Sequence, residues 1–578
     1  MKNPTVKKIS VCNPYDGVMF FLDNPWLSSW PKDVPQHIEY PLISLGDLLR
    51  NSAAASPDQV AINYFGTCIT FKELNGLVDK FGAALQNLGI EKGDRVAIYL
   101  PNIPQFVIAY YGTLRVGGVV VACSPLYKER EIGYILKDSG AKVIVAYDRL
   151  YPFVQAVRSE TKLIEVLTTS VRDYLPPALR LLSPLKGVKS YPCPGARDMK
   201  ELLEETRGPQ KTVQIDPKKD LALLQYTGGT TGIPKGAMLT HYNLIVNTEQ
   251  VRAWGVLHTG DIHLSVLPLF HIFGMTVAMN SPIYMRSTMV MLPDPRDIPG
   301  VIKAIEKYRP AIFCGVPTMY IALINTPDIE KHNLRSIKLC ISGASALPLE
   351  VQRKFEALTG GRLVEGYGLT ETSPVSHVNP LDEPRKNRPG SIGIPVSDTE
   401  AKVVDLESGE HDLPPGKAGE LVIRGPQVMM GYWNKPEDNK VAIRDGWFHT
   451  GDIATMAPDG YFSIVDRKKD MIDVSGFKVW PREVEETLFE HPAVQEAAVV
   501  GVPDARSGEA VKAFVVLKKE NEGKVTGEEL SKFCKEKIAS FKAPKFVEFR
   551  TELPKTAVGK VLRRELKQQQ QKELQVTT

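Results

Sequence analysis

The hydrophobic pattern of the chain alternates short apolar runs with longer segments of helical periodicity. Between two of these runs, residues 105–114 predict a helix. The runs consist largely of Val, Ile and Ala without polar alternation, which is typical of strands in parallel sheets that are covered by helices on both faces. The runs that predict such strands lie at 95–100, 119–122, 142–146, 311–313 and 338–341.

An antiparallel signal follows later in the chain. Between residues 398 and 423, polar and apolar residues alternate around Pro414, Pro415 and Gly416. This alternation predicts strands with one face in solvent. The fold class that follows is α/β, with parallel-sheet subdomains and a small antiparallel portion.

A second domain is predicted after the charged stretch 466–470. The segments beyond it predict two helices and two strands in a compact α+β unit of about 110 residues, which is a usual domain size. These segments lie at 483–490, 497–502, 512–517 and 528–538. We therefore divide the chain into a large N-terminal domain, residues 1–466, and a small mobile C-terminal domain, residues 467–578.

Composition narrows the class of protein. Hydrophobic residues make up 43% and charged residues 24%, as in ordinary globular proteins, and a net charge of +4 is too small to indicate nucleic-acid binding. The seven cysteines lie far apart, which argues against a zinc site or a disulfide framework and fits a reducing cytoplasm. No apolar run reaches the roughly 18 residues that cross a bilayer. We expect a soluble cytoplasmic protein, and a homodimer is compatible with it.

The segment 172–189 departs from this picture. Its leucines are interspersed with Arg172, Arg180, Lys186 and Lys189, and three prolines interrupt it. Because prolines break a long amphipathic helix, we expect a basic linker that lies over the fold. A peripheral contact with a membrane surface is the alternative.

The first candidate for chemistry is the stretch 226–236, which follows an apolar run at 221–225. Its glycines let backbone N–H groups approach an anion closely, and its threonine hydroxyls and one lysine ammonium add donors. This composition predicts a polyphosphate cradle, although it lacks the Gly-Lys-Ser/Thr order of a Walker A loop. A flexible surface loop is the alternative. The donors of the predicted cradle are Thr227, Gly228, Gly229, Thr230, Thr231, Gly232 and Lys235.

Two acidic residues lie in further turns. The turn 366–372 follows a predicted strand at 362–365, and open α/β sheets bind ligands beyond the carboxyl ends of their strands. In this turn the Glu371 carboxylate, beside Thr370, suits a Mg²⁺ ion that bridges phosphate oxygens. Asp452 lies in a Gly turn and is suited to accept hydrogen bonds from ribose hydroxyls, although an aspartate there is commonly an Asx cap.

Together these motifs resemble the adenylate-forming superfamily of acyl-CoA synthetases, peptide-synthetase adenylation domains and luciferases. The resemblance spans about residues 45–566, and the chain is most similar to bacterial and archaeal long-chain fatty-acid–CoA ligases. The closer likeness lies in 25–31, in the Gly228-Gly229 pair and in 554–560. Much of the superfamily has serine where Gly228 stands, so one hydroxyl donor is missing from the cradle.

The resemblance implies a ligase that uses ATP, with Mg²⁺, to join a fatty acid to CoA. The carboxylate attacks the α-phosphorus, pyrophosphate leaves, and the acyl-adenylate then reacts with the CoA thiol. Charge that accumulates on the phosphoryl oxygens must be met by cations. By residue type alone, Lys560 is one more surface lysine and His271 is a core histidine. The implied catalytic residues are Lys560, Glu371, Thr230 and His271, with Glu371 and Thr230 also at the metal.

The remaining contacts are also implied by the resemblance. Arg467 would contact the ribose alongside Asp452, and Lys469 would be the hinge about which the small domain rotates. The rest of the ATP/AMP site would be Gly343, Ala344, Ser345, Gly366, Tyr367, Gly368 and Thr370. The CoA site would include Ser475, Gly476 and Lys478. The acyl pocket would be lined by His271, Phe270, Phe273 and Tyr320.

Two alternatives stay open at this point. The acid could be medium-chain or aryl, or the acyl group could pass to a carrier protein instead of CoA. A non-catalytic nucleotide-binding module predicts the loss of Lys560, Glu371 or Asp452, and all three are present.

Overall fold

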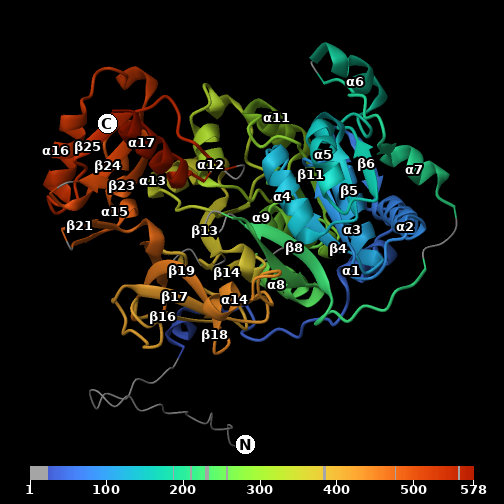
Figure 1. The fold of residues 1–578 in the computed structure, drawn as a ribbon, viewed down its shortest axis with the longest axis horizontal. Coiled ribbons are helices and arrows are strands. Elements are labelled where there is room, and N and C mark those ends of the chain that lie inside the picture. Colours follow the sequence, from blue (N-terminus) through green and yellow to red (C-terminus); the bar gives the residue numbers. More distant parts are fainter. Residues whose placement is uncertain are drawn as a thin grey trace, which may run out of the picture.

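A large body and a smaller C-terminal lobe make up the chain (Figure 1). The computed structural model describes residues 24–186, 188–207, 211–227, 233–255, 258–381, 386–475, 477–504, 506–556 and 560–577. Parallel strand pairs dominate the sheets of the body. An antiparallel sheet follows them in the sequence and precedes the C-terminal lobe. The predicted fold class is confirmed.

A seven-stranded sheet carries the strands that the Val and Ile runs predict. In spatial order it consists of β7 (Arg197–Asp198), β6 (Glu165–Thr169), β5 (Val143–Tyr147), β3 (Arg95–Tyr99), β4 (Val119–Ala122), β8 (Leu221–Thr227) and β9 (Lys235–Thr240). All neighbours are parallel except β8 and β9. Helices α3 (Pro104–Arg115), α4 (Glu129–Ser139) and α5 (Tyr151–Val157) pack on it, and α3 is buried along its whole length.

Two four-stranded sheets continue the body. They consist of β10 (Ile262–Ser265), β11 (Thr288–Met291), β1 (Val60–Tyr64) and β2 (Thr67–Thr70), and of β12 (Leu339–Ser342), β13 (Arg362–Gly368), β14 (Val375–Val378) and β15 (Ile394–Pro395). Single parallel bridges from Ile312 to His263 and to Leu339 join the two sheets. The strand predicted at 311–313 is wrong, because the segment makes only these bridges and Pro310 has no N–H with which to extend a ladder.

Further helices cover the three sheets of the body. They include α1 (Leu45–Ala55), α2 (Phe71–Asn87), α7 (Met199–Glu205), α8 (His241–Gly255), α9 (Ile272–Met275), α10 (Ser281–Tyr284), α11 (Ile298–Tyr308), α12 (Pro317–Ile324) and α13 (Leu349–Thr359). The first residues of α2 show why it begins where it does, since Thr70 and Glu73 form a reciprocal capping box. One large apolar core runs through the parallel sheets of the body and their helices.

The antiparallel portion predicted after residue 398 is a five-stranded sheet. It consists of β16 (Glu400–Val404), β17 (Gly419–Arg424), β18 (Ile443–Arg444), β19 (Trp447–Met456) and β20 (Phe462–Arg467). The short helix α14 (Pro436–Ala442) precedes β18. A single turn, Lys468–Asp470, connects β20 with the first strand of the C-terminal lobe.

The C-terminal lobe has its own sheet and core. The sheet consists of β22 (Phe477–Val479), β21 (Ile472–Val474), β24 (Gly508–Leu517), β23 (Val494–Asp504) and β25 (Phe546–Phe549). Helices α15 (Pro481–Phe489) and α16 (Gly527–Lys537) cover one face, and α17 (Arg563–Thr577) packs on β23. The predicted helices and strands of this lobe are therefore confirmed.

The segment 172–189 lies over the fold only at its start, where Tyr174 and Leu175 pack against the core of the body. It forms α6 (Pro177–Leu182) and the turn Ser183–Lys186, which project from the body at the upper right of Figure 1. Leu179, Leu181, Leu182 and Leu185 face solvent, so for this part of the segment the expectation of a linker packed on the body is wrong. No helix in the described ranges is long and apolar enough to cross a membrane.

Candidate active site

The candidate residues meet where the body, the β19–β20 hairpin and the C-terminal lobe come together. Thr227 ends β8 and lies opposite Lys235, the first residue of β9. Gly366, Tyr367 and Gly368 end β13, which is where open α/β sheets bind ligands. Some of the predicted cradle and CoA residues lie outside the described residues, namely Gly228, Gly229, Thr230, Thr231, Gly232 and Gly476.

Lys235 is already paired in this structure. Its Nζ lies 2.5 Å from Oδ1 of Asp438 in α14, and 5.4 Å from the centroid of the Tyr432 ring. Only 12% of the lysine side chain is exposed. The ammonium therefore belongs to a closely built site and not to a flexible surface.

Glu371 is a buried carboxylate in the turn Thr370–Thr372, directly after β13. Its Oε1 accepts a hydrogen bond of 2.7 Å from the Tyr432 hydroxyl, and burial raises the pKa of this carboxyl above its ordinary value. The described residues contain no group of three or more His, Cys, Asp and Glu that could hold a metal ion. One carboxylate fits Mg²⁺, which keeps several waters and takes phosphate oxygens as its other ligands.

Asp452 is engaged by groups from other segments. Its Oδ2 accepts a 2.6 Å hydrogen bond from the Tyr367 hydroxyl, and its Oδ1 lies 3.3 Å from Arg467 Nε across the β19–β20 ladder. An Asx cap would instead accept from a nearby backbone N–H. The carboxylate therefore joins β13 to β20 within the candidate nucleotide site, which speaks against the cap alternative.

Lys560 brings the C-terminal lobe into this site. Burial, and next the positive charge of Arg467, lower the pKa of its ammonium from an ordinary 10.5 to about 7, while Asp452 acts in the opposite direction. Hydrogen bonds from Lys560 N to Thr556 Oγ1 and from Thr556 N to Lys560 O close the turn that carries the lysine. Lys560 is thus enclosed beside two predicted nucleotide residues.

His271 faces the same cluster from the body. Its Nδ1 accepts a 3.3 Å hydrogen bond from Phe273 N at the start of α9, which assigns the ring proton to Nε2. Burial, and next the charge of Lys560, lower the pKa of His271 to about 4. The imidazole is therefore neutral at pH 7 and has one N–H to donate.

The other predicted acyl-pocket residues lie in different surroundings. Phe273 packs on the loop that carries Gly343, since a Cβ at Gly343 would lie 3.1 Å from its ring. Phe270 is partly buried, and its carbonyl accepts a hydrogen bond from the Gln225 amide. Tyr320 lies in the core, and its hydroxyl donates to the carbonyls of Phe313 and Ile341. Its place in the pocket lining stays a prediction.

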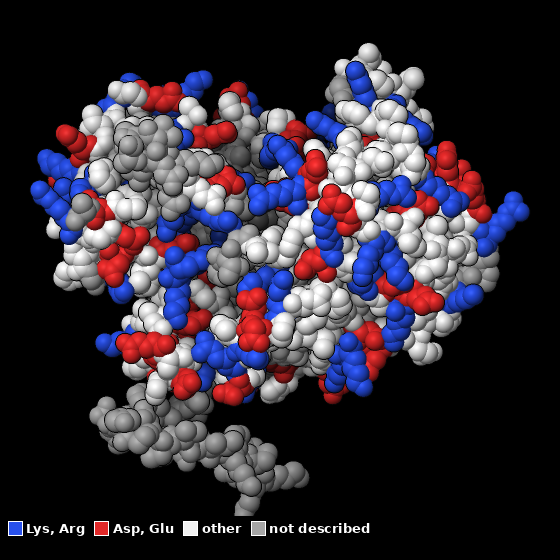
Figure 2. Space-filling view, in the orientation of Figure 1, with Lys and Arg blue, Asp and Glu red and all other residues white. Residues whose placement is uncertain are grey.

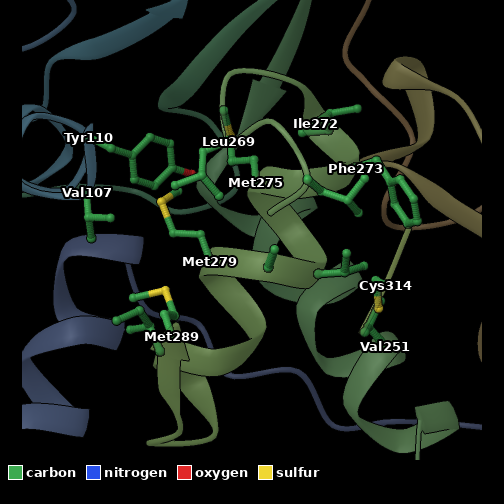
Figure 3. Close-up of a cluster of buried hydrophobic side chains, with 14 of the residues drawn as sticks. Val107, Tyr110, Val251, Leu269, Ile272, Phe273, Met275, Met279, Met289 and Cys314 are labelled. Atoms are coloured by element: carbon green, nitrogen blue, oxygen red, sulfur yellow. The ribbon is translucent and has the colours of Figure 1, made fainter. Parts of the chain in front are cut away.

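An apolar cluster lies around the loop that carries His271. Figure 3 shows side chains from this loop, from α9 and from several other elements. Those labelled are Val107, Tyr110, Val251, Leu269, Ile272, Phe273, Met275, Met279, Met289 and Cys314. These side chains are buried core residues, so the surroundings of His271 on this side are apolar.

The predicted hinge residue Lys469 borders the nucleotide cluster, since burial, and next the charge of Arg467, lower the pKa of its ammonium while Asp452 acts in the opposite direction. Lys469 is in the turn between β20 and β21, where the chain passes from the body to the lobe. Ser475 and Lys478 are exposed on the β21–β22 hairpin. Ser475 N donates to Ser507 O, and Lys478 Nζ lies 3.4 Å from Asp473, so both have their contacts within the lobe.

Three residues of the site had no signal in the sequence. Tyr432 bridges Glu371 and Lys235, Asp438 pairs with Lys235, and Gln225 anchors the loop at Phe270. None lies in a motif whose residue types indicate chemistry. Their roles arise from contacts between segments that are far apart in the chain.

Comparison with known proteins places this geometry in a family. The model of the AMP-binding enzyme family matches residues 49–433, and that of the AMP-binding enzyme C-terminal domain matches residues 483–560. The chain belongs to the AMP-binding enzyme family. A long-chain-fatty-acid–CoA ligase of Bacillus subtilis (strain 168) is 46% identical over 552 residues, 94% of this chain and 97% of the relative.

Solved structures agree with this assignment to the AMP-binding enzymes. The crystal structure of ATP-bound MatB from Rhodopseudomonas palustris is 30% identical, covers 91% of this chain and 99% of its own, and has a TM-score of 0.81. Apo MatB from the same organism, also 30% identical and with coverages of 92% and 99%, has a TM-score of 0.71. The arrangement in the present chain is therefore more similar to that of the ATP-bound enzyme.

Proposed function

We propose that this chain is an AMP-forming ligase that joins long-chain fatty acids to CoA. The observation that carries the proposal is the Lys560 ammonium, which the C-terminal lobe encloses beside Asp452, Arg467 and His271. The Bacillus subtilis relative, which matches nearly the whole chain, bears the name of this activity. The apolar surroundings of His271 around α9 are compatible with an alkyl substrate.

In the first half-reaction, a carboxylate oxygen of the fatty acid bonds to the α-phosphorus of ATP, and the bond from that phosphorus to the pyrophosphate oxygen breaks. Lys560 is placed to meet the negative charge of both reacting groups. His271 Nε2–H can orient the carboxylate by donating a hydrogen bond to it. Mg²⁺ held by Glu371, phosphate oxygens and Thr230 would supply further positive charge at the phosphates.

The nucleotide would be oriented by the groups between β13 and β20. The Asp452 carboxylate can accept hydrogen bonds from ribose hydroxyls, and Arg467 beside it can donate to the same sugar. The loop with Gly343, Ala344 and Ser345 and the turn after β13 would face the adenine. Thr227 and Lys235 would hold the β- and γ-phosphates together with the rest of the cradle.

The second half-reaction needs another arrangement of the lobe. The CoA thiolate forms a bond to the acyl carbon, and the bond to the AMP oxygen breaks. Rotation about Lys469 would withdraw Lys560 and bring the hairpin with Ser475, Gly476 and Lys478 to the adenylate. The greater similarity to ATP-bound than to apo MatB supports the present arrangement as the adenylating one.

A panel of acids from acetate to oleate tests the proposal, with pyrophosphate and AMP measured in the presence of CoA. We expect the highest kcat/KM with long-chain acids. A preference for aryl or medium-chain acids would show that the proposed substrate class is wrong. Acyl transfer to a holo-carrier in preference to CoA would show that the proposed acceptor is wrong. Release of ADP instead of AMP would refute the reaction itself.

We further propose that the protein works in the cytoplasm and docks on anionic membranes through α6. The described cysteines are all free thiols, as a reducing compartment favours. Leu181 in α6 and Leu185 in the turn Ser183–Lys186 are 79% and 85% exposed, and Arg180 and Lys189, nearby in the chain, are exposed as well. Residues 174–197 contain no Asp or Glu. In Figure 2 the projecting segment around α6, at the upper right, is mostly white with blue flanks. Apolar tips between basic side chains suit a bilayer interface with anionic lipid.

Vesicle flotation tests this surface. Wild type should float with phosphatidylglycerol-containing vesicles and not with pure phosphatidylcholine, and L181Q/L185Q should lose the binding. Leu42→Gln is the matched control, because Leu42 is 61% exposed elsewhere on the body. Equal flotation of wild type and L181Q/L185Q would refute the proposal. A homodimer that dissociates in L181Q/L185Q on sedimentation would assign the leucines to a second copy of the chain instead.

A further inference from the structure

The strap 430–435 lies along β9, the strand that begins with Lys235. Three backbone hydrogen bonds of 2.8–3.0 Å hold it there, from Met238 N to Gly431 O, from Met430 N to Met238 O and from Trp433 N to Gly236 O. Helix α14 follows the strap at once. The first turn of α14 is therefore held close to the phosphate-cradle lysine.

Asn439 fixes the orientation of this first turn. Its Oδ1 accepts a 2.6 Å hydrogen bond from Tyr432 N, and its Nδ2 donates to Tyr432 O at 3.1 Å. Gly431 has a φ of +138°, and a Cβ there would lie 3.0 Å from the Asn439 amide. Only glycine combines this backbone angle with so close an approach. The strap and the helix are thus tied to each other in one hydrogen-bonded joint.

That joint places Asp438 on Lys235. The two charged atoms are 2.5 Å apart, and 36% of the Asp438 side chain is exposed against 12% of the lysine. Asp438 lies in the first turn of α14, where the helix dipole stabilises a carboxylate. The neighbouring carboxylate Asp138 is occupied elsewhere, since it lies 3.7 Å from Lys435 Nζ and accepts a hydrogen bond from Tyr226.

We propose that Asp438 is a positioning residue that holds the Lys235 ammonium while the nucleotide site is empty and yields it to the β- and γ-phosphates of ATP. The inference rests on the proposed function, because it requires a substrate whose β- and γ-phosphates compete for this lysine. A mostly enclosed ammonium needs a partner, whereas a half-exposed carboxylate can be rehydrated once it is released. ATP binding therefore exchanges one partner of Lys235 for another.

The exchange has a consequence for affinity. Before the phosphates can pair fully with Lys235, the contact with Asp438 must open, and the carboxylate also repels the triphosphate. Removing the charge of Asp438 should therefore tighten ATP binding. For one half-exposed ion pair we expect a change of about two- to five-fold. AMP lacks the β- and γ-phosphates, so its affinity should not change.

The experiment compares Asp438→Asn with Glu437→Gln in the full-length enzyme. Glu437 is the neighbouring carboxylate of α14 and pairs only with Lys440 among the contacts of its side chain in the described structure, so it controls for net charge. KM for ATP is measured by pyrophosphate release, and Kd by calorimetry with ATP and Mg²⁺ in the absence of fatty acid, and with AMP. We expect D438N to lower KM and Kd for ATP about two- to five-fold, with kcat within about two-fold and AMP unchanged, and E437Q to match wild type.

A second background separates pairing from plain repulsion. In Lys235→Met the lysine is gone, so Asp438→Asn should tighten ATP binding less than it does in the wild-type background. An equal gain in both backgrounds would overturn the proposed exchange and leave only charge repulsion. A higher KM for ATP in D438N would overturn it as well, because Asp438 would then orient Lys235 for the bound nucleotide. Absence of AMP and pyrophosphate formation by wild type would refute the proposed function instead.

Discussion

The low pKa of Lys560 predicts how adenylation depends on pH. An ordinary lysine titrates near 10.5, whereas burial and the charge of Arg467 bring the pKa of Lys560 to about 7. The ammonium form is the one that meets the developing charge on the phosphate. At pH 9 only about 1% of Lys560 would be protonated in the free enzyme, so kcat/KM for ATP should fall about tenfold per pH unit above pH 7.

Bound ATP changes this profile in a defined direction. The negative charge of the phosphates favours the ammonium, so the pKa of Lys560 rises in the complex. The fall in kcat should therefore begin at a higher pH than the fall in kcat/KM, because kcat reports the bound state. The separation between the two limbs measures the interaction between Lys560 and the nucleotide.

Two substitutions of Lys560 test the assignment. Lys560→Arg keeps a charge that does not titrate in this range, so the fall above pH 7 should vanish even if the rate at pH 7 is lower. Lys560→Ala should reduce adenylation by about 10²–10³ at pH 7 and spare thioester formation from preformed acyl-adenylate. ATP–pyrophosphate exchange with oleate and no CoA is the suitable assay, since the CoA thiol itself titrates near this range. A kcat/KM that stays flat to pH 9, or the same fall in Lys560→Arg, would refute the reasoning.

The lowered pKa of Lys560 also predicts how the stability of the folded protein depends on pH. Because the folded-state pKa is depressed, the unfolded chain binds more protons between about pH 7 and 10.5, and the contribution of Lys560 to stability rises with pH across that window. The penalty is complete below pH 7 and absent above about 10.5. Lys560→Met should therefore raise the Tm more at pH 6 than at pH 9. An equal change at both pH values would contradict the shifted pKa.

Three further substitutions test separate parts of the site. Lys469→Pro should stiffen the turn between β20 and β21 and slow thioester formation more than adenylation; an equal loss in single-turnover assays of both steps would count against a hinge. Glu371→Gln should raise the Mg²⁺ concentration needed for half-maximal pyrophosphate release, and an unchanged titration would remove Glu371 from the metal site. Tyr432→Phe removes a hydrogen bond that lowers the pKa of Glu371, so its Mg²⁺ requirement should rise most at low pH. A requirement that is independent of pH would place Tyr432 outside this network.

Sequence patterns predicted the parts of the fold that are set by burial. Runs such as 119–122 have both faces covered, so the absence of polar alternation was enough to predict a strand in a parallel sheet. The leucines of α6 show the limit of the same reasoning, because apolar residues near prolines do not reveal whether anything covers them. The structure leaves Leu181 and Leu185 in solvent.

The site was predictable as motifs but not as a network. Asp452 had an ordinary Asx cap as its alternative, and the decision came from Tyr367, which lies 85 residues away in the chain. The hydroxyl that donates a hydrogen bond to Glu371 belongs to Tyr432, 61 residues away. Asp438, the partner of Lys235, is 203 residues away. Contacts at such separations depend on the packing of whole elements, and no local residue pattern encodes them.

Lys235 and Lys560 differ in the part of the molecule that carries them, and this difference accounts for their different partners. Lys235 belongs to the body and remains there through both half-reactions, so a fixed carboxylate such as Asp438 can hold it between turnovers. Lys560 belongs to the C-terminal lobe, which in the proposed mechanism leaves after the first half-reaction. A tight carboxylate partner in the body would oppose that departure at each turnover. A lysine with a pKa of about 7 needs no such partner, because it can enter and leave as a neutral amine and become charged when ATP is present.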